Sequence, residues 1–221
     1  MRVRTTPSKF IIATGVFATS LLLAACSDAP TQVKSANVPV RMPAPTKTAY
    51  AIVSHQVAGD TALSLITLDT EQEDSFLLPD GAKITFPAGS VCDVETTSYG
   101  AGEWDKPCDA QRTSVNITVR AWVDGEGHPR LDFSPHMRFN PAAGPVVISM
   151  VTADPAGTSL GINYCPDGAD GAAACVDESL ADADLLTWHQ PATGTYFRRV
   201  KHFSGYNIAA GRSLELSVEA Y

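Results

Sequence analysis

The sequence is poor in basic residues. Its 221 residues include 16 Lys and Arg against 24 Asp and Glu, so the formal net charge at pH 7 is −8. Nucleic acids and anionic membrane leaflets attract proteins through clustered positive charge, and the overall balance of this chain is the opposite. Composition therefore argues against a nucleic-acid partner.

The sequence also lacks a hydrophobic run of the length typical of membrane-spanning helices. The apolar stretch at residues 10–25 is interrupted by Thr, Ser and Gly, whereas a spanning helix needs about 20 apolar residues. The positively charged residues Arg2, Arg4 and Lys9 precede this apolar stretch. A positive head followed by a short apolar run is typical of a cleaved secretion signal. Its removal leaves 13 basic against 24 acidic residues, a formal charge of −11.

The signal ends at Leu23-Ala24-Ala25-Cys26. An ordinary secretion signal ends in Ala-x-Ala and needs no cysteine, although a cleaved, unlipidated signal remains an alternative. The four residues resemble the lipobox of bacterial lipoproteins, whose leader is cut before a cysteine that then carries acyl chains. The resemblance implies a signal peptide at residues 1–25 and a membrane anchor at Cys26. Ser27 stands where retention in the enterobacterial inner membrane calls for Asp, which favours the outer membrane of the cell envelope.

The cysteines lack zinc-site spacing. Of five cysteines, four remain once Cys26 carries lipid, and they include no C-x2-C pair and no nearby His. An exported protein meets an oxidising compartment, so an even number predicts disulfides. Four cysteines allow three pairings. We expect the local one, Cys92–Cys108 and Cys165–Cys175, because each pair brackets a polar, Gly-rich segment.

Amphipathic helical patterns are also lacking. Residues 26–49 are rich in Pro, Ser, Thr, Ala and Val without a sustained period, which predicts a disordered tether. Residues 50–221 alternate short apolar segments with turn sequences, so we expect one all-β domain, an antiparallel β-sandwich. The expected strands are 51–53, 63–68, 76–78, 83–86, 114–123, 130–133, 146–151, 185–188, 195–200, 206–209 and 214–218. Residues 63–68 could instead form a helical turn. From residue 75 onward, only residues 177–184 suggest a helix, and a brief one.

Three segments, taken in their order along the chain, indicate a type of β-sandwich. Residues 78–91, residues 131–139 with the strand from Val146, and residues 200–206 together resemble the ZU-five type of β-sandwich. That domain occurs in zonula-occludens proteins, netrin receptors and ankyrins. The likeness covers about residues 75–221 and implies a non-catalytic interaction or structural module without a cofactor. Its partner at the envelope would be a protein or a glycan.

Some relatives of that type cleave themselves at His-Phe-Ser, which occurs here as His202-Phe203-Ser204. In that chemistry the Ser204 hydroxyl attacks the Phe203 carbonyl, His202 acts as base, and the resulting ester is hydrolysed. A structural interpretation is also open: His202 bonds to a backbone group, Phe203 fills the core, and Ser204 begins the turn into the last hairpin.

The acidic insertion offers a calcium hypothesis. Asp167, Asp170 and Asp177 supply carboxylates on a Gly-containing segment, but the Asp-x-Asp-x-Asp-Gly order is absent and a solvated loop is the default. Trp104, Trp122 and Trp188 could stack on a sugar, although core packing accounts for tryptophans equally well.

Overall fold

A computed structural model describes residues 47–48, 50–55, 61–78, 80–153, 159–166 and 174–216. All of them belong to one compact unit, Ala36–Tyr221. The predicted signal peptide (1–25), the anchor at Cys26 and nearly all of the tether (26–49) lie outside the described residues. Within the described ranges, no helix is long and apolar enough to cross a membrane.

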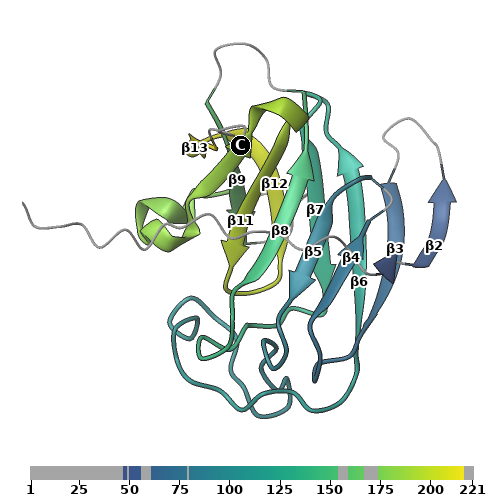
Figure 1. Cartoon of the computed structure of the whole chain (residues 1–221), viewed down its shortest axis with the longest axis vertical. Coiled ribbons are helices and arrows are strands. Elements are labelled where there is room, and N and C mark those ends of the chain that lie inside the picture. Colours follow the sequence, from purple (N-terminus) through teal and green to yellow (C-terminus); the bar gives the residue numbers. More distant parts are fainter. Residues whose placement is uncertain are drawn as a thin grey trace, which may run out of the picture. The chain divides into compact units, whose positions relative to one another are not determined.

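The described strands form two sheets that face each other (Figure 1). In spatial order, the first sheet contains β1 (Lys47–Thr48), β4 (Asp74–Leu77), β5 (Lys83–Phe86), β8 (Val146–Val151), β11 (Thr195–Val200), β10 (Thr187–Gln190) and β13 (Ser213–Glu215). The second contains β2 (Tyr50–His55), β3 (Thr61–Leu68), β6 (Val115–Val123), β7 (Pro129–Ser134), β12 (Gly205–Ala210) and β9 (Leu160–Cys165). Only β1–β4 and β10–β13 pair in parallel among these strands. The prediction of an all-β sandwich is confirmed.

Period-2 alternation explains how the strands are buried. In β6, Ile117, Val119 and Ala121 face the core, and each is at most 3% exposed. The strand then leaves the core, because Val123 is 54% exposed. Gly127 closes the following turn at a φ of 87°, in the region where glycine carries no steric penalty. Gly81, in the turn between β4 and β5, has a φ of 85° for the same reason.

Several boundaries differ from the sequence-based prediction. Lys47 and Thr48 fall in the predicted tether, yet they pair as β1 with β4. A two-residue bridge has no periodicity that a sequence could reveal. Leu185 was expected in a strand but ends the 3-10 helix η2 (Ala183–Leu185), so β10 starts at Thr187. With η1 (Glu178–Leu180), η2 confirms the brief helix predicted at residues 177–184. A third such turn, η3 (Pro191–Thr193), was not predicted.

An aromatic cluster joins the two sheets at the centre of the core. Phe86 of β5 meets Phe76, Phe139 and Phe203 edge-on at centroid distances of 6.2, 6.2 and 5.7 Å. The ring of Phe203 also stacks on Phe133 of β7 at 4.2 Å. Since Phe86 and Phe133 belong to different sheets, Phe203 packs between the layers, as the structural interpretation of the tripeptide predicted.

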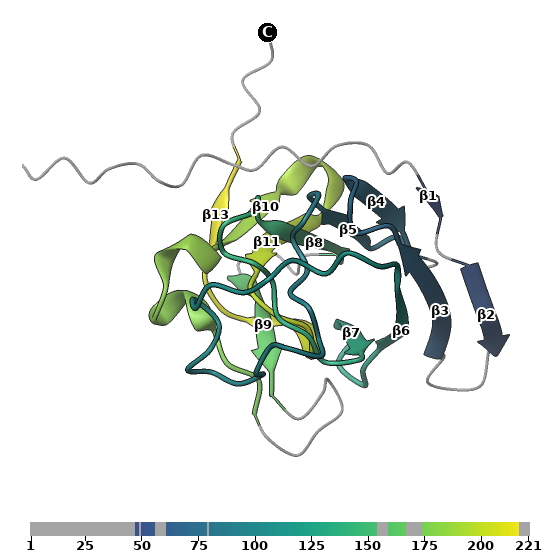
Figure 2. The same ribbon diagram turned by 90° about the horizontal axis from the view of Figure 1, so that it is seen from below.

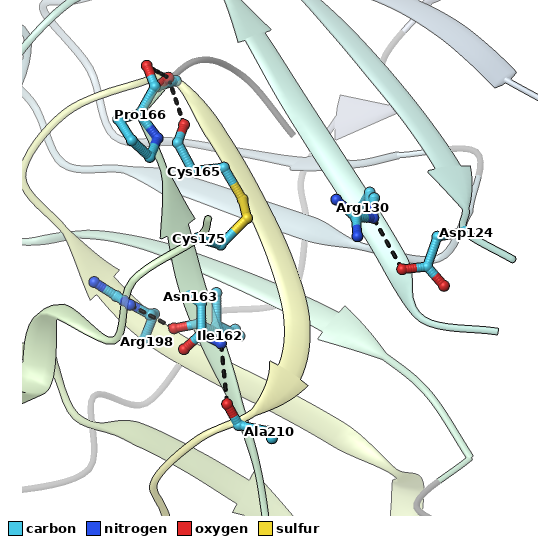
Figure 3. Close-up of a disulfide and its surroundings, with 10 residues drawn as sticks. Asp124, Arg130, Ile162, Asn163, Cys165, Pro166, Cys175, Arg198 and Ala210 are labelled. Atoms are coloured by element: carbon cyan, nitrogen blue, oxygen red, sulfur yellow. Dashed lines mark hydrogen bonds and ion pairs between the residues drawn. A yellow bond between two sulfur atoms is a disulfide. The ribbon is translucent and has the colours of Figure 1, made fainter. Parts of the chain in front are cut away.

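Both disulfides form in the expected local pairing. Cys92 bonds to Cys108 at 2.00 Å and Cys165 to Cys175 at 2.02 Å. The second bond joins Cys165, the last residue of β9, to Cys175 (Figure 3). In the loop-entropy model, each bond stabilises the fold by about 2–4 kcal/mol.

The first disulfide closes a loop at the end of the sandwich that faces the viewer in Figure 2. There the β5–β6 and β7–β8 connections contact each other, since Cys92 N–H donates to the Arg138 carbonyl at 3.1 Å. The β11–β12 turn joins them, since Phe203 N–H donates to the Met137 carbonyl at 2.7 Å. Three connections that are distant in sequence therefore meet at this end.

Replacing Phe86 by Ala should destabilise the fold by about 3–5 kcal/mol, because it leaves a cavity among the rings of Phe76, Phe139 and Phe203. Urea unfolding measures the change. Val151→Ala is the control, because Val151 is 45% exposed and its loss should change stability by no more than about 0.5 kcal/mol. Equal effects of the two substitutions would contradict the assigned core.

Candidate functional site

His202 lies in the turn between β11 and β12, and its side chain is completely buried. The indole of Trp104 stacks on its ring with centroids 4.0 Å apart, and Tyr164 meets it edge-on at 4.4 Å. The Nε2 atom lies 3.0 Å from Oε1 of Glu178. Together with Tyr99 and Arg198, these residues form what we call the His202 cluster.

Glu178 contacts two buried side chains, those of His202 and Arg198, through its two carboxylate oxygens. It is the first residue of η1, and the Asp177 side chain caps that turn by accepting from Ser179 N–H at 2.9 Å. While one carboxylate oxygen contacts His202, the other lies 2.5 Å from Nη2 of Arg198. A carboxylate with two such partners holds both groups in fixed orientations.

Arg198 is the most unusual member of the cluster, because its charged side chain is 0% exposed. It shares the core-facing side of β11 with Tyr196 and Val200, by the alternation of the strand. Its Nη1 atom donates to the Ile162 carbonyl of β9 at 2.5 Å, so it links the first sheet to an edge of the second (Figure 3). A buried cation requires a counter-charge, which Glu178 supplies.

The charge of Glu178 follows from these contacts. Burial on its own would raise the pKa of this carboxyl, since it disfavours the ionised form. The hydrogen bond to His202 and the charge of Arg198 outweigh burial and hold the pKa of Glu178 below its usual value. The carboxylate is therefore ionised at neutral pH and neutralises Arg198.

Ser204 makes structural hydrogen bonds. Its hydroxyl donates to the carbonyl oxygens of Cys165 at 3.0 Å and Pro166 at 3.3 Å, where the second disulfide loop begins. No hydrogen bond joins Ser204 to His202 in the part of the chain that the structure describes, and the buried Nδ1 of His202 has no partner there. The catalytic roles predicted for His202 and Ser204 stay predictions.

The carbonyl of Phe203, which self-cleavage would require Ser204 to attack, has a donor of its own. The Tyr99 hydroxyl donates to it at 2.6 Å from the first disulfide loop. Burial raises the pKa of the Tyr99 hydroxyl well above its usual value, and nearby Tyr164 adds to the rise. The group stays protonated and polarises this carbonyl, as an oxyanion-hole donor does.

The calcium hypothesis gains no support. Asp167 and Asp170 lie outside the described residues, and the side chain of Asp177 caps η1. In the described ranges, no group of three or more His, Cys, Asp or Glu side chains is arranged to hold a metal ion.

The three tryptophans have separate environments. Trp104 packs on His202, whereas the guanidinium of Arg120 lies over the Trp122 ring, 5.0 Å from its centroid. Trp188 is half-buried on β10. Trp122 belongs to the second sheet and Trp188 to the first, so these two do not form one platform with Trp104.

Sequence reasoning missed Tyr99, Glu178 and Arg198. A signal existed for Arg198, because period 2 places it on the same face of its strand as two apolar residues. An arginine on a buried face predicts a counter-ion. Nothing in the sequence indicates that Glu178 is that counter-ion, since it comes from a separate insertion.

Comparison with known proteins found no match to this chain. No family model matches the chain, and the curated proteins and solved structures yielded no match either. The resemblance to the ZU-five type is therefore still a prediction.

Replacing Glu178 by Gln should destabilise the protein by about 3–5 kcal/mol at pH 7, because Arg198 loses its buried counter-charge. Since the folded-state pKa of Glu178 is lowered, this contribution is present above the unfolded pKa of about 4.3 and is lost as pH falls through the folded value. The difference in unfolding free energy between wild type and variant should thus be constant from about pH 7 to 5 and narrow below about pH 4.

Urea titrations across that range make the measurement. Glu126→Gln is the matched control, because its side chain is 82% exposed and the substitution should have little effect at any pH. A difference for Glu178→Gln that persists undiminished to about pH 2.5 would show that the charge of Glu178 is not its source.

Proposed function

We propose that the protein is a lipoprotein of the bacterial outer membrane, anchored through Cys26, whose β-sandwich is a non-catalytic interaction or structural module. The lipobox-like sequence before Cys26 supports the anchor. The two disulfides support an oxidising compartment outside the cytoplasm. The tether at residues 26–49 would separate the sandwich from the membrane surface.

The observation that carries the non-catalytic proposal is the hydrogen bonding of Ser204. Its hydroxyl proton points to the Cys165 and Pro166 carbonyls, which are not bases. His202 is held by Glu178, and Phe203 lies in the core at 0% exposure. Each residue of the tripeptide thus has a structural role in the connection from β11 to β12, which crosses between the sheets and is not the hairpin that the sequence predicted.

The edge of β9 limits how a partner can bind. Exposed sheet edges can accept a strand from another chain, but the outward-facing backbone groups of Ile162 and Tyr164 in β9 already have partners. Ile162 N–H donates to Thr187 Oγ1 at 2.9 Å, and its carbonyl accepts from Arg198. Tyr164 exchanges backbone hydrogen bonds of 2.9 and 2.7 Å with Val176. A partner is therefore expected to use loops or sheet faces in preference to this edge.

Self-cleavage is the second candidate, and the Tyr99 hydrogen bond favours it. In that reaction, Ser204 Oγ bonds to the Phe203 carbonyl carbon while the peptide C–N bond breaks. His202 would carry the hydroxyl proton to the departing nitrogen. Tyr99, already 2.6 Å from the carbonyl oxygen, would stabilise its negative charge. Water then hydrolyses the ester, leaving a carboxyl end at Phe203 and a free amine at Ser204.

Intact mass separates the two candidates. The non-catalytic module predicts one denatured, undigested species of full mass, lighter than the reduced formula by the two hydrogens that each disulfide removes. Self-cleavage predicts two fragments that divide at Phe203–Ser204 and a return to one species in Ser204→Ala. Fragments of that kind would overturn the non-catalytic proposal.

Replacing Cys26 by Ser should remove the anchor, because the thiol that accepts the lipid is lost. We expect the wild-type protein to sediment with outer membranes and to incorporate radiolabelled palmitate. The variant should lose the label and the sedimentation of processed protein with those membranes. Ser27→Ala is the control, since it keeps the cysteine. Palmitate incorporation that persists in Cys26→Ser would disprove this anchor.

A further inference from the structure

Two insertions lie between the segments that carry the resemblance, residues 92–108 and residues 165–184. Their described parts approach each other at the loop-bearing end of the sandwich, where Lys201 pairs with both Asp105 and Asp182. A cavity of about 240 Å³ lies there. Trp104 and Asp105 line it from the first insertion, and Asp184 of η2 lines it from the end of the second. Arg199 and Lys201 contribute from the end of β11. The insertions therefore supply Trp104, Asp105 and Asp184, whereas the β7–β8 connection supplies much of the rest of the lining, including Pro141 and Pro145.

Trp104 forms a rigid wall of this cavity. Its ring is stacked on buried His202 at 4.0 Å and meets Tyr99 edge-on at 4.7 Å. Arg138 fixes the backbone on either side, because its Nη1 donates to the Glu103 and Lys106 carbonyls at 2.7 and 2.5 Å. The Cys92–Cys108 bond closes the loop. A side chain ordered in advance loses little entropy when a ligand binds.

The charged part of the lining is braced as well. The Lys201 ammonium lies 2.5 Å from carboxylate oxygens of both Asp105 and Asp182, so it connects the two insertions. Asp182 in turn accepts from Asp184 N–H at 3.0 Å. The side chains of Arg199 and Asp184 make no ion pair or hydrogen bond with other described residues. Both are therefore available to a ligand.

The chemistry of these walls defines the ligand class. An indole offers an apolar face, and Pro141, Pro145 and Leu185 add apolar contacts. A guanidinium donates hydrogen bonds and a carboxylate accepts them. The lining contains two acidic and two basic side chains, Asp105 and Asp184 against Arg199 and Lys201, which favours an uncharged ligand. Its volume is below the about 300–1,000 Å³ of ordinary small-molecule sites, so one ring fits and a drug-sized ligand does not.

A pyranose combines these properties, because its C–H face is apolar and its hydroxyls both donate and accept. We propose that this cavity binds one pyranose unit of a cell-envelope glycan. The inference rests on the proposed interaction module and names its ligand class and site.

The test uses the mature lipoprotein in a sugar-free zwitterionic detergent, with its three tryptophans labelled with ¹⁵N. Trp122→Phe and Trp188→Phe identify two of the indole N–H signals, and the third belongs to Trp104. The probes are maltotetraose, cellotetraose and the N-acetylglucosamine tetramer. We expect at least one of them to shift the Trp104 signal saturably while the other two signals stay in place.

Arg199→Ala should weaken that binding about tenfold or more, because a charged donor to the sugar is lost. Arg112→Ala, which removes an exposed arginine outside the cavity, should not change it. Arg199 has no ion pair in the described structure, so its loss should leave the fold intact. The unchanged Trp122 and Trp188 signals verify that it does.

A Trp104 signal that stays in place with all probes at about 20 mM would overturn the glycan site. Undiminished binding in Arg199→Ala would also overturn it. A chain that is anchored and uncleaved but does not respond to sugar keeps the proposed module and loses only this ligand. A chain that cleaves itself fails the mass test, whatever its response to sugar.

Discussion

A buried positive charge determines how the distinctive part of this protein is arranged. Arg198 points into the core from β11, and an unpaired cation there would be strongly unfavourable. Glu178 neutralises it and at the same time holds His202. Because Glu178 belongs to η1, the acidic insertion must fold against the sandwich for the core to be electrically balanced. The Cys165–Cys175 disulfide closes the preceding loop, so it reduces the conformational entropy that the chain loses when Glu178 takes that position.

The insertions have a common effect on the tripeptide His202-Phe203-Ser204. One supplies Trp104 and Tyr99, which cover the His202 ring and bind the Phe203 carbonyl. The other supplies Glu178 and lies next to the Pro166 carbonyl that accepts from Ser204. The contacts that hold the tripeptide in place include the Tyr99 hydrogen bond, which also polarises the carbonyl of the Phe203–Ser204 peptide bond. The Ser204 hydroxyl donates to the Cys165 and Pro166 carbonyls, whereas self-cleavage would require it to give its proton to His202.

Much of the fold could be predicted because it depends on local patterns. Short apolar segments separated by turn sequences predicted the strand at residues 114–123, which the structure shows as β6. Local spacing indicated both disulfide pairs. β9 was not among the expected strands, because Gly161, Asn163 and a closing cysteine give a weak pattern, and its strand depends on pairing with β12. The Glu178–Arg198 ion pair could not be predicted from the sequence, because its members are 20 residues apart and in different elements.

The sequence by itself determined the β-rich class and the cysteine supply, and it indicated export and a lipid anchor, because these depend on composition, short motifs and period-2 burial. Only the tertiary structure decided which polar groups meet. Trp104 reached His202, and Tyr99 reached the Phe203 carbonyl across 104 residues, because the loops at one end of the sandwich are brought together by core packing. Contacts between distant residues depend on how the whole core packs, so a local sequence pattern contains no record of them.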